Sequence, residues 1–159
     1  MSMEQSEEIK KLFGKYAEGY QSKHMDVTPF KSGLDIFYRS LRKGDDINVL
    51  DVACGPGNNS KYILSQDPDI KLLGIDLSEE MIKLARKNNP EAEFRCMDCK
   101  DILRLNRTFD GIVLGFVMPY LDMSSSSKLI QDCYALMGDK GAIYLSAIEG
   151  NYKKSAYQG

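Results

Sequence analysis

The chain has 159 residues, of which 43% are hydrophobic and 28% charged, and its formal net charge is −2. This composition is typical of one soluble globular domain, and it offers no basic surface of the kind that holds nucleic acid by its phosphates. The acidic, polar first residues do not resemble a secretory signal, and no apolar stretch approaches the length of a membrane span. We therefore expect a cytoplasmic domain without nucleic-acid or membrane partners.

The first 44 residues are predicted to form two helices that precede the main fold. Apolar side chains recur at helical spacing between residues 6 and 21, and Tyr16 and Tyr20 fall on that face. After a polar break, Thr28 and Pro29 suit the N-cap and the first turn of a second helix. Gly44 is typical of the residue that ends such a helix.

From residue 45 onward, the pattern alternates between strands and helices. The predicted strands are residues 47–53, 71–75, 92–96, 109–115 and 141–148. The predicted helices between them are residues 58–66, a segment opened by Ser78, and residues 124–138. Such alternation is typical of a doubly wound α/β fold, in which helices cover both faces of a mainly parallel sheet. In the last helix we expect Gly138 as the end and the following inward side chains: Leu129, Ile130, Cys133, Leu136 and Met137.

An acidic residue stands at the end of each of the first three predicted strands. Asp51 precedes the turn CGPG, Asp76 ends the segment GID, and Asp98 follows the third strand in CMDC. The carboxyl ends of parallel strands meet at one edge of the sheet, where ligands of this fold bind. We therefore expect the three carboxylates to converge on one ligand site.

The turn after Asp51 contains Gly55 and Gly57, which permit a sharp bend and a close approach to a ligand. A dinucleotide fingerprint requires a third glycine where Ser60 stands, and a triphosphate loop requires Lys and then Ser or Thr after its last glycine. A phosphate about 6 Å from the Asp51 carboxylate would also cost about 2–3 kcal/mol in repulsion. The turn therefore favours a cationic ligand without phosphates.

The other two acids suit a nucleoside. Asp76 is placed to accept hydrogen bonds from both hydroxyls of a ribose, with Leu77 and Met81 as apolar surface for an adenine. Asp98 is placed to accept from an exocyclic amine at the far end of the ring. Each acid taken alone is equally compatible with a structural role in a turn or a cap, but their joint spacing favours a ligand site.

At these residues the chain resembles the class I S-adenosylmethionine-dependent methyltransferases that act on small molecules. VLDVACGPG is similar to the first motif of that family, LLGIDLSEEMIKLAR to its second-strand motif, RCMDCKDI to its third-strand motif and FDGIVLGFVMPYL to its fourth-strand motif. The resemblance covers residues 47–148. Two positions depart from it, because Ala53 and Met97 stand where the family usually has glycine.

The resemblance implies a Rossmann-like fold and S-adenosyl-L-methionine as cofactor. It places Asp51, Ala53, Gly55 and Gly57 around the methionine part, Asp76 at the ribose, Leu77 and Met81 against the adenine, Asp98 and Cys99 at the adenine edge, and Phe116 near the transferring methyl group. The segment KYAEGY resembles a helix that closes over the cofactor, which would make Tyr16 and Tyr20 lid residues. Ordinary core packing of these two tyrosines is an equally open interpretation.

The sequence identifies no catalytic residue, because methyl transfer needs a base only when the acceptor must lose a proton. His24 is the single histidine, but its polar surroundings favour a surface role. Tyr120 in MPYLD is a comparable candidate. Cys96 and Cys99 lack a second ligand pair, so we expect small semi-buried thiols and no metal site.

We expect three parts: a helical lid over residues 1–44, a cofactor-binding α/β domain over residues 45–150, and a tail over residues 151–159. The sheet of the resembling family usually carries two further strands after the fifth, and we expect this chain to lack them. The open sheet edge that would result favours self-association.

Three functions remain open from the sequence. The first is methyl transfer to an unidentified small-molecule acceptor. The second is a module or subunit that binds the cofactor without catalysis. The third is an NAD-dependent oxidoreductase, which the three acids and Ser60 in place of the third glycine disfavour.

Overall fold

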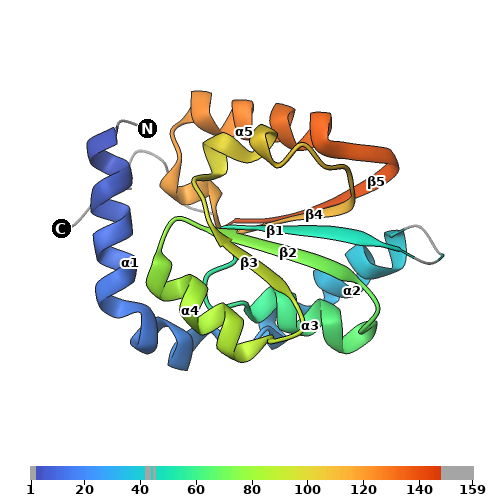
Figure 1. The fold of residues 1–159 in the computed structure, drawn as a ribbon, viewed down its shortest axis with the longest axis horizontal. Coiled ribbons are helices and arrows are strands. Elements are labelled where there is room, and N and C mark those ends of the chain that lie inside the picture. Colours follow the sequence, from blue (N-terminus) through green and yellow to red (C-terminus); the bar gives the residue numbers. More distant parts are fainter. Residues whose placement is uncertain (1–2, 42–43, 45, 148–159) are drawn as a thin grey trace.

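The computed structural model describes residues 3–41, 44 and 46–147. Its centre is a sheet of five parallel strands in the order β3-β2-β1-β4-β5 (Figure 1). The strands are β1 (Asn48–Val52), β2 (Lys71–Asp76), β3 (Glu93–Cys96), β4 (Phe109–Gly115) and β5 (Met137–Ser146). The predicted doubly wound α/β fold is therefore confirmed.

Helices cover both faces of this sheet. The α-helices are α1 (Met3–His24), α2 (Lys31–Ser40), α3 (Asn58–Gln66), α4 (Glu79–Asn88) and α5 (Met123–Leu136), and the short 3-10 segments are η1 (Thr28–Phe30), η2 (Cys99–Leu105) and η3 (Met118–Tyr120). Helices α2, α3 and α4 lie on one face and α5 lies on the other, while α1 stands beyond the carboxyl ends of the strands (Figure 1). Among the described residues, none of the helices has both the length and the apolar character of a membrane span.

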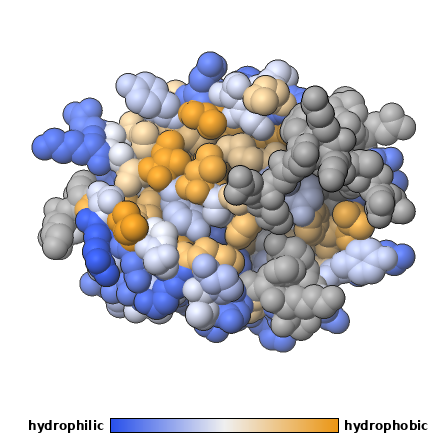
Figure 2. All heavy atoms as spheres, turned by 180° about the vertical axis from the view of Figure 1, so that it is seen from behind, coloured by the Kyte–Doolittle hydropathy of each residue, from blue (hydrophilic) through white to orange (hydrophobic). Residues whose placement is uncertain are grey.

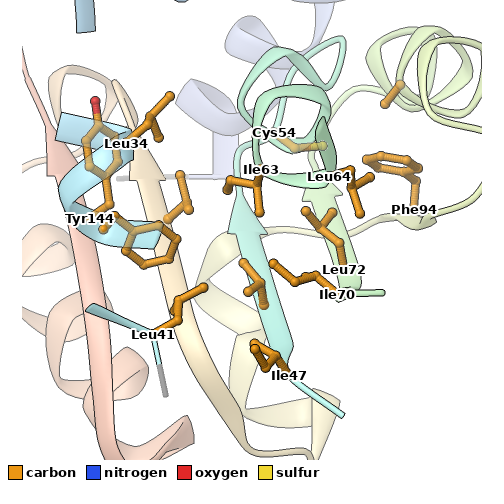
Figure 3. Close-up of a cluster of buried hydrophobic side chains, with 14 of the residues drawn as sticks. Leu34, Leu41, Ile47, Cys54, Ile63, Leu64, Ile70, Leu72, Phe94 and Tyr144 are labelled. Carbon is orange, nitrogen blue, oxygen red and sulfur yellow. The ribbon is translucent and has the colours of Figure 1, made fainter. Parts of the chain in front are cut away.

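Each face of the sheet has its own apolar core, because successive side chains of a strand point to opposite faces. In β1, Val49 packs on the side of α2, α3 and α4, whereas Leu50 packs on the side of α5. Figure 3 shows the first of these cores, where Leu34 of α2 and Tyr144 of β5 lie among the buried side chains. The two cores fix the strands in place and leave their carboxyl ends free for a site.

The second helix begins and ends differently from the prediction. Thr28 and Pro29 form η1, and α2 starts only at Lys31, with no side-chain cap at its N-terminus. The backbone N–H of Thr28 donates to the Asp26 carboxylate at 2.9 Å, which forms a local turn before η1, and η1 has no side-chain cap either. Helix α2 ends at Ser40 and not near Gly44, because Leu41 adopts an extended conformation and turns its side chain into the core.

The last helix passes directly into the last strand. Helix α5 ends at Leu136, and β5 begins at Met137, so Gly138 lies inside the strand and does not end the helix as predicted. The register of β5 on β4 shifts between Phe109 and Gly111, which accommodates the irregular start of the strand. The prediction that Ile130 faces the core is also wrong, since 43% of it is exposed beside the buried Leu129.

Strands β3 and β5 are the edges of the described sheet. Ile143 and Leu145 on β5, and Ile130 and Tyr134 on α5, keep much of their apolar surface exposed. Figure 2, which views the molecule from behind, shows apolar residues gathered in the upper half, where α5 and β5 lie. The expected lack of further strands after the fifth concerns residues outside the described ranges, and self-association through an open sheet edge stays a prediction.

Candidate functional site

A cavity opens at the carboxyl ends of β1 to β4, and α1 contributes to its wall. The empty space within it, including the part open to solvent, is about 700 Å³. It is located where the strand order reverses between β1 and β4, the position at which doubly wound sheets bind ligands. The lining residues are Phe13, Ala53, Gly55, Asp76, Leu77, Met81, Met97, Asp98, Cys99, Gly115, Phe116, Val117, Tyr120 and Leu121.

The sheet register staggers the three predicted acids. Asp51 pairs with Gly74, two residues before Asp76, and Asp76 pairs with Cys96, two residues before Asp98. Each acid therefore lies about 7 Å further along the strand direction than the one before it. Asp51 is fully buried inside the sheet, whereas Asp76 and Asp98 line the cavity. All three acids thus lie at the carboxyl ends of neighbouring strands, and the role of Asp51 in the same ligand site stays a prediction.

Asp76 holds the backbone on both sides of the cavity mouth. Its carboxylate accepts the backbone N–H of Gly55 and that of Ser78, each at 2.9 Å. Burial raises the pKa of Asp76, and the backbone N–H donors oppose that rise. The same carboxylate thus joins the glycine turn to the start of α4, where Ser78 caps the helix by accepting the N–H of Met81.

Asp51 lies beneath the glycine turn, outside the cavity lining. Ser60 donates its hydroxyl hydrogen to Oδ2 of Asp51 at 2.6 Å, which explains why serine serves where a dinucleotide fingerprint has glycine. Oδ1 of Asp51 has no hydrogen-bond partner among the described residues, and the same is true of Oδ1 of the buried Asn59. Burial raises the pKa of Asp51 to about 7, and the nearby Asp76 charge contributes to the rise. Such orphaned acceptors suit a ligand or water that brings N–H or O–H donors.

The two turn glycines have different roles. Gly55, with φ of +54°, lines the cavity and donates its N–H to Asp76. Gly57, with φ of +81°, faces away from it, and a side-chain carbon there would lie 2.4 Å from Nδ2 of Asn89 in α4's C-cap. The missing side chain of Gly57 makes room for α4, and the expectation that this glycine approaches a ligand stays a prediction.

The adenine-edge candidates Asp98 and Cys99 lie together at the start of η2. Asp98 caps η2 by accepting the N–H of Lys100 at 3.0 Å, and both candidates line the cavity. Burial and the neighbouring Asp98 raise the pKa of the Cys99 thiol to about 12, so the thiol stays protonated near neutral pH. Cys96 is exposed, contrary to the expected semi-buried thiol. Within the described residues, no group of three His, Cys, Asp or Glu side chains could hold a metal ion.

The opposite wall of the cavity is apolar and aromatic. Phe116 follows β4 with φ of +57°, a conformation that is rare for a bulky side chain and that directs its ring. Its ring lies edge-on to Phe30 of η1 with centroids 5.2 Å apart. Phe13 of α1 and Tyr120 of η3 form a second edge-to-face pair, also with centroids 5.2 Å apart. Two aromatic pairs thus join the N-terminal segment to the loop after β4.

Of the two predicted lid tyrosines, the structure describes the side chain of Tyr16 alone. Tyr16 is 54% exposed and is absent from the lining, which Phe13 provides one turn earlier on α1. The side chains of Tyr20 and His24 lie outside the described part of the structure. Ala17, and not Tyr16, is the buried residue of this turn, so the inward face of α1 is rotated from the predicted one.

Sequence reasoning missed several lining residues. Phe13, Val117 and Leu121 carry no chemical signature, and only the fold brings them beside the strand ends. Gly115 is the last residue of β4, and residues at the carboxyl ends of parallel strands lie at the ligand-binding edge of the sheet. This rule, which located the three acids, could also have located Gly115. A side-chain carbon at Gly115 would lie 2.3 Å from Nδ2 of Asn59, which explains the glycine.

Known sequences that resemble this chain are methyltransferases. A family model described as a methyltransferase domain matches residues 49–141. A demethylmenaquinone methyltransferase of Thermotoga maritima is 24% identical over 140 residues, which cover 85% of this chain and 59% of that protein. A malonyl-[acyl-carrier protein] O-methyltransferase of Acetivibrio thermocellus is 35% identical over 89 residues, which cover 54% of this chain and 31% of that protein. The chain spans about half the length of the curated relatives that it matches.

Solved structures give the same result. The plantazolicin methyltransferase BpumL in complex with SAH superposes with a TM-score of 0.64 at 27% identity, covering 78% of this chain and 48% of that one. The DhpI-SAM-HEP complex shares the fold, with a TM-score of 0.72 at 18% identity over 97% of this chain and 71% of that one. Because the family model matches more than half of the 159 residues, the chain belongs to the methyltransferase domain family and has the Rossmann-like fold of class I methyltransferases.

Proposed function

We propose that the protein is an S-adenosylmethionine-dependent methyltransferase acting on a small molecule that is not identified. The observation that carries this proposal is one cavity at the strand ends, lined by Asp76 and Asp98 on one side and by apolar side chains on the other. A nucleoside without phosphates matches that division, since two carboxylates repel phosphates and accept hydroxyl and amine donors.

The polar and apolar residues at the strand ends are compatible with the parts of the cofactor. The orphaned Oδ1 of Asp51 and the turn at Gly55 suit the ammonium of the methionine part. Asp76 would hold the ribose, with Leu77 and Met81 beside the adenine. The remaining adenine-edge and methyl-side candidates are Asp98, Cys99 and Phe116.

When bound, S-adenosylmethionine supplies a methyl group that its sulfonium already activates for transfer. The chain's own residues then bind, orient and exclude water. The aromatic wall around Phe116 and Tyr120 suits a planar or apolar acceptor, and the protonated Cys99 thiol is not a ready base. An acceptor that needs no deprotonation by the enzyme fits this wall best.

The names of two relatives, a demethylmenaquinone methyltransferase and a malonyl-[acyl-carrier protein] O-methyltransferase, are compatible with a small or carrier-bound acceptor. We infer no particular acceptor from them, because the matched segments cover only 59% and 31% of those proteins. A cofactor-binding module without catalysis is the second candidate, because a cavity lined in this way suits the cofactor whether or not an acceptor binds beside it.

Calorimetric titration tests the proposal directly. We expect S-adenosylhomocysteine to bind and NAD to give no heat of binding. Binding of NAD without a response to S-adenosylhomocysteine would contradict the proposal and favour an oxidoreductase. A screen of candidate acceptors with radiolabelled S-adenosylmethionine then separates the two remaining functions, since methyl incorporation into any acceptor excludes a non-catalytic module.

A further inference from the structure

Two consecutive asparagines at the C-terminal end of α4 contact the glycine turn, and neither of them lines the cavity. Asn88 donates an Nδ2 hydrogen to the carbonyl of Pro56 at 2.8 Å, and Asn89 donates one to the carbonyl of Gly57 at 3.1 Å. Their two carbonyl acceptors belong to successive residues of the turn. The asparagines thus fix the orientation of the peptide groups that follow Gly55, the turn residue that lines the cavity.

Asn89 is the inner member of the pair. It is fully buried, and its Nδ2 also donates to the carbonyl of Ala85 at 3.2 Å, within α4. A side-chain carbon on Gly57 would approach the same nitrogen to 2.4 Å. The left-handed conformation of Gly57 therefore leaves the space that the Asn89 amide occupies. A change in the backbone of the turn would break the hydrogen bond from Asn89 to the Gly57 carbonyl.

Asn88 is the outer member, and it also reaches α1. Its Nδ2 donates to Oε1 of Gln21 at 2.9 Å in addition to the carbonyl of Pro56. An amide nitrogen has two hydrogens, so this side chain uses one on the turn and one on α1. On the same helix, Gly14 lies close to α4, since a side-chain carbon there would be 3.1 Å from Oε2 of Glu80.

Helix α1 also carries Phe13, which lines the cavity and packs against Tyr120. Gln21 and Phe13 are two turns apart on one rigid helix. A change in the docking of α1 at Gln21 is therefore transmitted to the cavity wall at Phe13. The hydrogen bonds of Asn88 connect that docking to the turn at the other side of the cavity.

We propose that Asn88 is a positioning residue that couples the docking of α1 to the conformation of the glycine turn, and thereby to cofactor affinity. It does not line the cavity, and it contacts the turn through Pro56 and the N-terminal segment through Gln21 and, at 3.8 Å, the sulfur of Met25. This inference rests on the proposed function for the identity of the cofactor, but the hydrogen bonds that it uses do not depend on that identity.

The test compares Asn88→Asp with Asn106→Asp in the full chain. Asn88→Asp keeps the shape and replaces the donor by an oxygen that faces two acceptor oxygens. The exposed Asn106 lies outside the cavity lining and receives the same charge change, which makes it the matched control. We expect Asn88→Asp to weaken S-adenosylhomocysteine binding about tenfold, and the control to leave it unchanged.

A double-mutant cycle with Gln21→Ala separates coupling from a general loss of fold. We expect Gln21→Ala to weaken binding about threefold alone and to have little further effect in the Asn88→Asp background. Hydrogen exchange of the ligand-free protein is the second readout. The Gly57 amide, which donates to the carbonyl of Cys54, and the α1 amides should exchange faster in Asn88→Asp than in the control.

The outcomes distinguish this inference from the proposed function. If the unmodified chain binds S-adenosylhomocysteine and Asn88→Asp binds equally well, the positioning role is wrong while the proposed function stands. If the unmodified chain does not bind it, the proposed function fails and hydrogen exchange alone decides the positioning role. Exchange rates equal to those of Asn106→Asp at both the turn and α1 would overturn the inference.

Discussion

The two walls of the cavity are built in different ways. On the β2 and β3 side, Asp76 and Asp98 accept backbone N–H groups of Gly55, Ser78 and Lys100, so the polar wall is fixed by hydrogen bonds close to the strand ends. On the β4 side, the wall consists of aromatic and aliphatic side chains, and its two edge-to-face pairs join segments that are far apart in the sequence.

This difference indicates a division of tasks. A wall held by backbone hydrogen bonds keeps its geometry before any ligand arrives, as the recognition of a constant cofactor requires. A wall made of apolar contacts between α1, η1 and η3 depends on how those segments pack, which suits a variable acceptor. The predictions below test the polar wall first and the apolar wall last.

The largest expected effect concerns the buried acid beneath the polar wall. Burial raises the pKa of Asp51 from 3.8 to about 7, so the folded state binds more protons than the unfolded state between these pH values. The contribution of Asp51 to stability is therefore greatest below pH 4 and falls as the pH rises towards 7, by up to about 4 kcal/mol.

Asp51→Asn should remove this dependence, because an amide does not titrate. Urea unfolding at several pH values should show wild type losing stability relative to Asp51→Asn as the pH rises. The exposed Asp69→Asn serves as the control for the charge change and should follow wild type. Parallel profiles for wild type and Asp51→Asn would contradict the burial argument.

The next effect concerns the turn. Gly57→Ala should destabilise the fold by about 3 kcal/mol, since it adds left-handed strain and displaces the Asn89 amide from its acceptors. Gly19→Ala is the matched control on α1, where an added carbon meets nothing within 4 Å, and it should stabilise the helix by about 0.5–1 kcal/mol. Equal unfolding midpoints for the two variants would show that the turn is not constrained by α4.

Asp76→Ala should weaken S-adenosylhomocysteine binding by about 1–3 kcal/mol, because the ribose hydroxyls and the Gly55 N–H both lose an acceptor. Asp101→Ala, a neighbouring acid of η2 outside the cavity lining, should leave the affinity unchanged. Calorimetry measures both. Unaltered affinity in Asp76→Ala would show that Asp76 does not bind the cofactor. The polar wall would then have no special role in cofactor recognition compared with the apolar wall.

The smallest effect concerns the apolar wall. A double-mutant cycle of Phe13→Leu and Tyr120→Leu should give a coupling of about 0.5–1.5 kcal/mol in unfolding free energy, as expected for an edge-to-face pair. Leu12→Ala on the same helix is half-exposed and should show no coupling to Tyr120. Additive effects of Phe13 and Tyr120 would mean that α1 does not dock through this pair.

The polar wall was largely predictable from the sequence, whereas the apolar wall was not. Asp76 and Asp98 could be located because an acid directly after a buried strand must lie near the sheet edge. The burial of Asp51 could not, because it follows from the register of β1 on β2, which depends on pairing across the chain. The burial of Ala17 in place of Tyr16 depends on the rotation of α1, which helical periodicity leaves open by one position.

The boundaries that sequence reasoning missed have a similar cause. Gly138 matches the usual end of a helix, but the pairing of Met137 with Phe109 places it in β5. Likewise Gly57 meets a packing requirement that the sequence does not show, because a side chain there would collide with Asn89. In both cases a tertiary contact adds a constraint that local sequence preference does not reveal.

Resonance mapping of S-adenosylhomocysteine on the isotope-labelled chain tests most directly whether an adenosine compound lies across the strand tips. The amides of Gly55, Leu77 and Cys99 should shift together as the ligand is added, with little change along α5. Shifts confined to the exposed β5 edge, or no shifts at these three amides at saturation, would contradict the proposed site.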